Sequence, residues 1–188
     1  MHRRALAAAA ALAALALSVT ACGATQHKPS STGGTQAPST TRAPLPAGKN
    51  PSEISKMVCS PKAQQEIARI LGVTAHVETP TWVGHLYSCR YDYPSGSFVL
   101  SVKELSSWSE TYGYFDGLGT TLGDKGALAN LGQGAFTTSD GSVIVRKDWK
   151  VLTVNIAPLP AQFGKPPTSK ADVAFTVADI ILGCWDGD

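Results

Sequence analysis

The chain has 188 residues, of which 43% are hydrophobic and 16% charged, and its formal net charge is +2. All 14 acidic residues lie at or beyond Glu53, against 11 Lys and Arg residues there, so this part of the chain carries about −3. A mildly acidic domain lacks the concentrated basic face that nucleic-acid binding requires, and we expect no nucleic-acid partner.

Residues 1–21 have the organisation of a signal peptide. Arg3 and Arg4 precede an Ala- and Leu-rich run from Ala5 to Leu17, which has the length of a secretory core and is too short to span a bilayer. Small residues then lead to a cysteine in the motif Val19-Thr20-Ala21-Cys22. This motif resembles the lipobox of bacterial lipoproteins. The resemblance implies cleavage before Cys22 and lipidation of Cys22; the alternative is a secreted protein in which Cys22 forms a disulfide.

Residues 22–49 are predicted to be the lipidated N-terminus and a tether. Gly23 to Lys49 is rich in Ser, Thr, Pro, Gly and Ala and contains no aromatic residue. Such a segment cannot bury enough apolar surface to offset its ordering entropy, so we expect it to be disordered. As a flexible coil, about 27 residues span on the order of 30 Å. The Thr and Pro content is also compatible with a glycosylated stalk.

Residues 50–188 are long enough for one globular domain with a substantial core. Asn50-Pro51-Ser52-Glu53 has the pattern of a short helical start. A stronger helix is predicted over Pro61 to Leu71, because Ser60 suits the N-cap, proline suits the first helical position and Gly72 can end the helix.

Two strands are predicted next, over Trp82 to Tyr93 and Gly96 to Leu105, because both runs are rich in aromatic and β-branched residues. Pro94-Ser95-Gly96 supplies the turn between them. Alternation along the first strand places six side chains on one face: Val83, His85, Tyr87, Cys89, Tyr91 and Tyr93.

A second helix is predicted from the capping box Ser107-Trp108-Ser109-Glu110, with an apolar stripe that continues towards Leu118. A glycine-rich passage runs from Gly117 to Gly134, and we interpret its first part, Gly117 to Gly123, as a flexible connection. Three further strands follow, over Ala135 to Thr138, Ser142 to Lys147 and Val151 to Ile156.

The last predicted helix begins near Ser169 and Asp172, ends at Gly183, and is apolar on nearly every side, so we expect it to be buried across the sheet. The order of elements predicts a single α+β domain, with an antiparallel sheet of about five strands packed by two to three helices.

With Cys22 lipidated, three cysteines remain, an odd number for an oxidising compartment. We favour a pair between Cys59, just before a helix, and Cys89, within a strand on which that helix can pack. Closing a loop of about 31 residues contributes roughly 3–4 kcal/mol. Cys184 is then expected to be unpaired or available to a partner.

The sequence gives no catalytic or metal-binding motif. It contains no Cys-x-x-Cys, no Gly-x-Ser-x-Gly and no His-Glu-x-x-His. The domain has two histidines, His76 and His85, whose spacing does not make a ligand pair, and we interpret His85 as a strand residue satisfied by its neighbours. We expect no cofactor and no enzymatic activity.

Two features are candidates for binding a ligand or partner. The first is the aromatic strand face of Tyr87, Tyr91 and Tyr93, which suits the wall of a groove for sugars or peptides, although strand aromatics are usually core. The second is Trp149, in a tight corner among basic residues. It is predicted either to dock on a partner, a glycan or the membrane surface, or to fold back onto the sheet.

Several short segments together resemble a known group of proteins: a cysteine before a helix ending in Leu71-Gly72, then Ser88-Cys89-Arg90-Tyr91, Asn130-Leu131-Gly132-Gln133-Gly134-Ala135-Phe136 and Val151-Leu152-Thr153-Val154. The chain resembles actinobacterial cell-envelope lipoproteins of unknown function and is similar to extracellular sensor domains of mycobacterial serine/threonine kinases. The resemblance implies a Cys59–Cys89 bridge, an α+β fold and no known enzymatic activity.

We therefore expect a lipid-anchored protein at the extracytoplasmic face of the cell membrane. Its expected role is a non-catalytic binding, sensor or accessory module, with an unknown envelope protein, glycan or small ligand as partner. One alternative is a lipid carrier, which needs an enclosed apolar cavity. Another is an envelope hydrolase, which needs a polar cleft joining a nucleophile or carboxylates to His76 or His85. The third alternative is a purely structural role.

Overall fold

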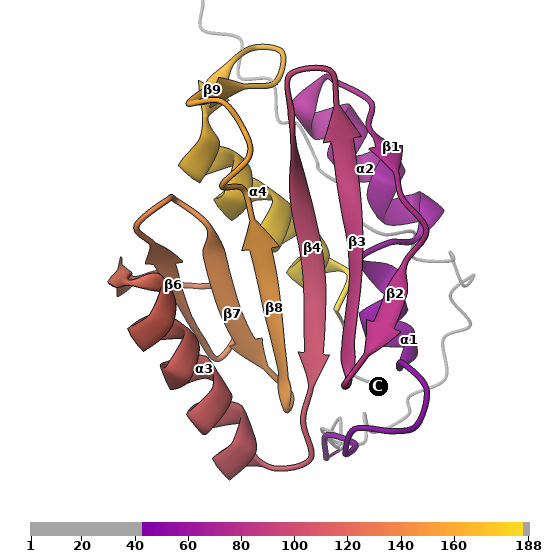
Figure 1. Cartoon of the computed structure of the whole chain (residues 1–188), viewed down its shortest axis with the longest axis vertical. Helices are drawn as coiled ribbons and strands as arrows, with labels where there is room; N and C mark the ends of the chain where they lie inside the picture. The colour runs from indigo at the N-terminus through magenta and orange to yellow at the C-terminus, as the bar shows by residue number, and fades with distance from the viewer. Residues whose placement is uncertain (1–42, 186–188) are drawn as a thin grey trace, which may run out of the picture.

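The computed structural model describes residues 43–185, so the predicted signal peptide, Cys22 and most of the predicted tether lie outside the described residues. Within that range the chain forms an eight-stranded antiparallel sheet, a separate two-stranded sheet and four helices (Figure 1). The elements are α1 (Glu53–Met57), α2 (Pro61–Leu71), β1 (His76–Val77), β2 (Thr81–Val83), β3 (Leu86–Tyr93), β4 (Gly96–Glu104), α3 (Trp108–Leu122), β5 (Asp124–Ala127), β6 (Gly134–Thr138), β7 (Val143–Lys147), β8 (Lys150–Asn155), β9 (Gln162–Phe163), β10 (Thr168–Ser169) and α4 (Lys170–Gly183).

The predicted α+β class is confirmed, but the sheet is wider than the five strands expected. Its order is β1-β3-β4-β8-β7-β6-β5, and β2 also pairs with β3. The additional strands are short: β1 has two residues, β2 three and β5 four. Runs of this length carry too few residues for an alternating pattern to be visible in the sequence.

One predicted strand is in fact two. Gly84 and His85 have positive φ angles of 55° and 62° and form a two-residue turn, so that β2 folds back on β3 and Val83 pairs with Leu86. A primed turn of this kind matches the twist of the flanking strands. His85 therefore lies in a turn, exposed to solvent, and the interpretation of it as a strand residue is wrong.

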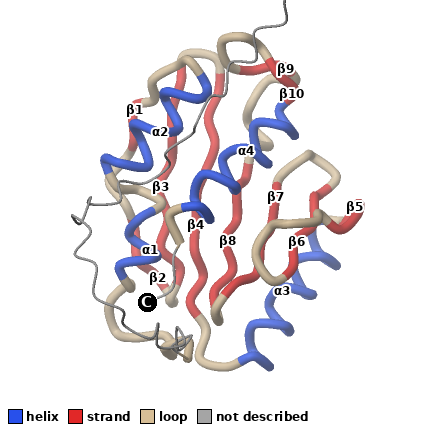
Figure 2. The backbone as a smooth tube through the Cα atoms, turned by 180° about the vertical axis from the view of Figure 1, so that it is seen from behind, coloured by secondary structure: helices blue, strands red, loops and turns tan. Residues whose placement is uncertain are grey.

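The helices lie on both faces of the sheet, and the pleat of β7 separates two cores (Figure 1, Figure 2). Val143 and Val145 point to the main core, beneath α2 and α4, whereas Ile144 points to a smaller core with Phe136, beneath α3. Because neighbouring residues on a strand face opposite sides, β7 is buried on both faces. That double burial explains its continuous apolar sequence.

The predicted helix starts are confirmed by their N-caps. The hydroxyls of Ser60, Ser107 and Ser169 accept hydrogen bonds from backbone N–H groups three residues later, at 3.2, 3.2 and 3.1 Å. The Glu110 carboxylate reaches back over the start of α3, but it accepts from the N–H of Ser106, at 2.9 Å, rather than from the N–H of the N-cap Ser107 as in a capping box. Helix α2 ends as predicted at Gly72, whose φ of 64° is left-handed.

Two helix predictions need correction. The glycine-rich passage is not a flexible connection throughout, because α3 continues to Leu122, and Phe115 and Leu118 pack against the smaller core. Helix α4 lies across the sheet as expected but is not buried on every side: one face covers the sheet, whereas the apolar side chain of Phe175 is 40% exposed. Its high average hydrophobicity concealed a one-sided helix.

The disulfide between Cys59 and Cys89 is present, with a Cα–Cα distance of 5.9 Å, and it fastens the start of α2 to the middle of β3. Cys184 is not a free thiol in the structure, so the expectation of an unpaired Cys184 is wrong. None of the helices formed by residues 43–185 has the length and apolar character required to cross a bilayer.

Candidate ligand-binding cleft

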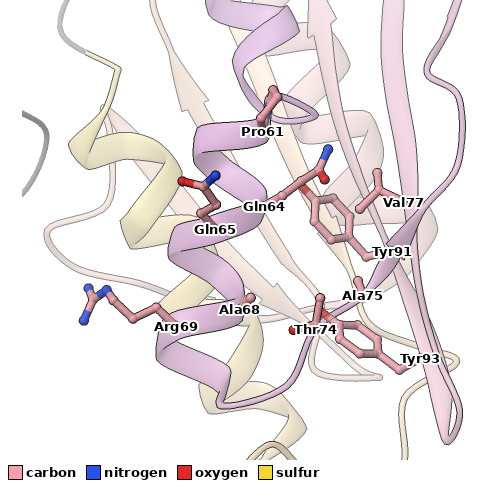
Figure 3. A pocket seen from close by; sticks show the side chains of 10 residues that line it. All are labelled: Pro61, Gln64, Gln65, Ala68, Arg69, Thr74, Ala75, Val77, Tyr91 and Tyr93. Atoms are coloured by element: carbon pink, nitrogen blue, oxygen red, sulfur yellow. The ribbon is translucent and has the colours of Figure 1, made fainter.

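An open cleft of about 500 Å³ lies between α2 and the edge of the sheet formed by β1 and β3 (Figure 3). Its walls combine apolar and uncharged polar side chains with one cation: Pro61, Gln64, Gln65, Ala68, Arg69, Thr74, Ala75, Val77, Tyr91 and Tyr93. The cleft therefore contains two of the three tyrosines that the strand pattern singled out.

The pleat of β3 determines where these tyrosines point. Cys89, Tyr91 and Tyr93 are at alternate positions and face α2, and the disulfide at Cys89 holds the strand against the start of that helix. Val77 on β1 pairs with Tyr91, which places the edge strand beside the cleft. The tyrosines are thus held by a strand, a disulfide and a neighbouring strand rather than by a loop.

Tyr91 has a structural role at the inner wall. Its side chain is 1% exposed, its ring stacks on Phe98 with centroids 4.8 Å apart, and its hydroxyl donates to the Val58 carbonyl at 2.7 Å. This bond joins β3 to the residue that follows α1. Every polar group of the side chain is therefore satisfied within the protein.

Tyr93 differs in its hydroxyl. The side chain is 9% exposed and its ring meets Phe163 edge-on at 4.8 Å, yet the buried hydroxyl has no hydrogen-bond partner within the described structure. Figure 3 shows this ring reaching from β3 toward α2, beside Thr74. Burial raises the pKa of the Tyr93 hydroxyl well above its ordinary value, so the group remains a proton donor.

Polar side chains of α2 form the opposite wall. The amide of Gln64 donates to the Cys59 carbonyl at 2.9 Å, which fixes the side chain beside the cleft. Arg69 is paired with Glu66 at 2.9 Å on the exposed surface of the helix. Gln64 and Thr74 were not among the predicted contact residues; the signal present in the sequence is the pair of glutamines next to the apolar stripe of α2.

The other predicted contact residues lie elsewhere. Tyr87 is half-buried on the same strand but does not line the cleft. Trp149 lies in the turn between β7 and β8 with a φ of 55°, and it packs edge-on against Trp108 of α3, with centroids 6.4 Å apart. It thus folds back onto a helix, and its indole N–H is buried with no partner among the described residues.

The two histidines do not join the cleft. His76 and His85 are both exposed, and the ring centroids of His85 and Trp82 are 5.7 Å apart. Across residues 43–185, no three His, Cys, Asp or Glu side chains lie close enough together to hold a metal ion. The lining that the structure describes supplies hydrogen-bond donors and acceptors, without a paired acid and base.

Comparisons with known proteins give no relative from which a function could be carried over. No family model matches the chain, and neither the curated proteins nor the solved structures contain a match.

Proposed function

We propose that this chain is a lipoprotein of the cell envelope, held at the extracytoplasmic face of the membrane by lipid on Cys22. Its domain acts as a non-catalytic binding, sensor or accessory module. The lipobox, the Ser/Thr/Pro/Gly-rich segment behind it and the resemblance to actinobacterial envelope lipoproteins support the location. The cleft between α2 and β3 supports the binding role.

One observation carries the binding proposal: Tyr93 lines the cleft, and its hydroxyl is buried without a hydrogen-bond partner among the described residues. A buried donor left unsatisfied costs about 1–3 kcal/mol. A ligand toward which the Tyr93 side chain turns its hydroxyl can accept the hydrogen bond and recover that free energy. Gln64 and Thr74 add further polar groups nearby. These groups suit a ligand rich in hydroxyl and carbonyl oxygens, such as an envelope glycan or a short peptide.

The cleft favours this role over a lipid carrier and over an envelope hydrolase. A carrier for an apolar ligand needs an enclosed apolar cavity, whereas this cleft is open and edged by glutamine, threonine and arginine side chains. A hydrolase needs a general base beside a nucleophile. The residues described at the cleft include no histidine or carboxylate, and the two histidines lie outside it.

Native mass spectrometry of the mature protein, incubated with soluble glycan and peptide fragments from a digest of its own cell wall, tests the proposal. We expect a bound fragment, and Tyr93→Phe should weaken its affinity about tenfold, which corresponds to about 1.4 kcal/mol. Tyr87→Phe removes a hydroxyl from the same strand outside the cleft and serves as the matched control. Equal binding by wild type and Tyr93→Phe would contradict the assignment of the cleft.

A further inference from the structure

Four separate segments meet at one end of the molecule. The N–H of Ala47 donates to the Leu105 carbonyl at 3.1 Å, and the N–H of Leu105 donates to the Trp149 carbonyl at 2.9 Å. The Trp82 indole donates to the Lys49 carbonyl at 3.0 Å. We call this region the entry end: residues 43–49, 82–86, 103–108 and 147–150. Figure 1 shows the start of the described chain, the β2–β3 turn and the start of α3 together there.

The entry end carries the two most exposed large apolar side chains of the described domain, together with an exposed tryptophan. Val83, at the β2–β3 turn, is 77% exposed, Leu45 is 50% exposed and Trp108 is 38% exposed. Tyr112, one turn further along α3, is 47% exposed and its ring is 6.0 Å from that of Trp108. Gathered apolar and aromatic groups of this kind mark a contact surface.

The composition of this surface matches a membrane interface. Tryptophan and tyrosine concentrate at the headgroup level of bilayers, where an apolar ring and a polar tip are both accommodated. Lysines accompany them: Lys49 is exposed, and the Lys103 amine donates to the Gly84 carbonyl beneath the turn. The entry end contains four lysines (Lys49, Lys103, Lys147 and Lys150) against Glu104 and Asp148, a formal charge of +2 that the neighbouring Glu110 reduces to +1. Because this charge is small, apolar contact must supply most of the attraction.

The place where the chain enters the domain indicates that the partner of this surface is the lipid bilayer. About 20 residues separate Cys22 from Ala43, and a flexible coil of that length spans about 25 Å. A lipid on Cys22 would therefore hold the entry end within reach of the bilayer at an effective concentration of the order of millimolar. Even weak affinity for lipid then suffices for docking.

We propose that the entry end docks on the lipid surface to which the chain is anchored, with Val83, Leu45 and Trp108 entering the headgroup region. The inference rests on the proposed lipidation of Cys22. Docking in this orientation sets the direction of the cleft. Tyr93 lies seven residues along β3 from Leu86, roughly 23 Å at 3.3 Å per residue, so this side of the cleft lies far from the lipid.

Tryptophan quenching tests the docking. Mass spectrometry first establishes whether Cys22 carries lipid. The mature lipidated protein is then reconstituted into vesicles of phosphatidylcholine and phosphatidylglycerol, with and without brominated acyl chains. We expect brominated lipid to quench the fluorescence of Trp82, Trp108 and Trp149 at the entry end, at low and high salt alike. Trp185 is 1% exposed and its carbonyl accepts from the Lys147 amine at the edge of the entry end, so its buried ring should contribute least to the quenching. The double variant Leu45→Asp, Val83→Asp retains all tryptophans and should lose at least half of the quenching.

Phe175→Asp is the matched control, because Phe175 is 40% exposed on α4, and its quenching should equal that of the wild type. Thermal melting confirms that each variant is folded. Absent quenching in a lipidated wild type, or undiminished quenching in the double variant, would overturn the docking and leave the proposed function standing. An unmodified Cys22 would overturn both.

Discussion

Tyr91 and Tyr93 are two residues apart on one strand, and their hydroxyls are in opposite situations. Tyr91 donates to the Val58 carbonyl, whereas the buried hydroxyl of Tyr93 has no partner within the described residues. A bond that is made stabilises the fold, and a buried group without one destabilises it. The pair therefore allows a structural hydroxyl and a ligand-directed hydroxyl to be compared at nearly the same place.

We predict opposite effects of removing these hydroxyls. Tyr91→Phe should lower the free energy of unfolding by about 1–2 kcal/mol, because it leaves the buried Val58 carbonyl without its donor. Tyr93→Phe should leave that free energy unchanged or raise it by up to about 1 kcal/mol, because it removes an unsatisfied group. Urea denaturation measures both. A loss of stability in Tyr93→Phe as large as that in Tyr91→Phe would refute the distinction.

At this scale the sequence predicted part of the candidate site. Alternation along the strand placed Tyr91 and Tyr93 on one face, and the structure places both at the cleft. Which hydroxyl lacks a partner depends on where Val58 and Phe163 lie, and those positions are set by folding of distant segments. Trp149 was ambiguous for the same reason, since its neighbour Trp108 is 41 residues away in the sequence.

Among the elements, α2 depends on a close approach at its end. Gly72 has a φ of 64°, and a Cβ there would lie 2.3 Å from the Lys165 carbonyl oxygen. The N–H of Lys165 also donates to the Leu71 carbonyl at 2.8 Å, so the loop before β10 packs directly on the helix end. A side chain at this position is opposed both by the backbone conformation and by the neighbouring loop.

Two glycine substitutions should therefore act in opposite directions. Gly72→Ala should destabilise the domain by about 2–3 kcal/mol, from the left-handed backbone and the overlap with Lys165. Gly113→Ala, inside α3 with open space around its Cβ, should stabilise it by about 0.5–1 kcal/mol, because alanine is the better helix former. Calorimetry of both variants measures the difference. Equal melting temperatures would show that the loop at Lys165 moves aside without a loss of stability.

The elements were predictable where their signals are local. Caps, turn residues and long alternating strands lie within a few residues of one another, so Ser60, Gly72 and Ser107 gave correct boundaries. The short strands β1 and β5 form only because a neighbouring strand offers its hydrogen-bonding edge. The turn at His85 was missed because the preference of Gly84 for positive φ was weighed less than the alternation around it.

For the whole molecule, the proposed attachment and the proposed binding cleft lie at different ends. The chain enters the domain beside Leu105 and Trp82, and the cleft lies toward the opposite end of β3. An anchored domain in this arrangement presents its cleft outward, toward the envelope. The α+β class followed from the order of helices and strands, whereas the two-core arrangement needed the three-dimensional packing of α3.

The most direct test of the central claim is the mass of the mature N-terminal peptide, from protein extracted with detergent from its own membranes. We predict a peptide that begins at Cys22 and carries diacylglyceryl and acyl groups, and a Cys22→Ala variant that is absent from the membrane fraction. A mature N-terminus elsewhere, or an unmodified Cys22, would contradict the account.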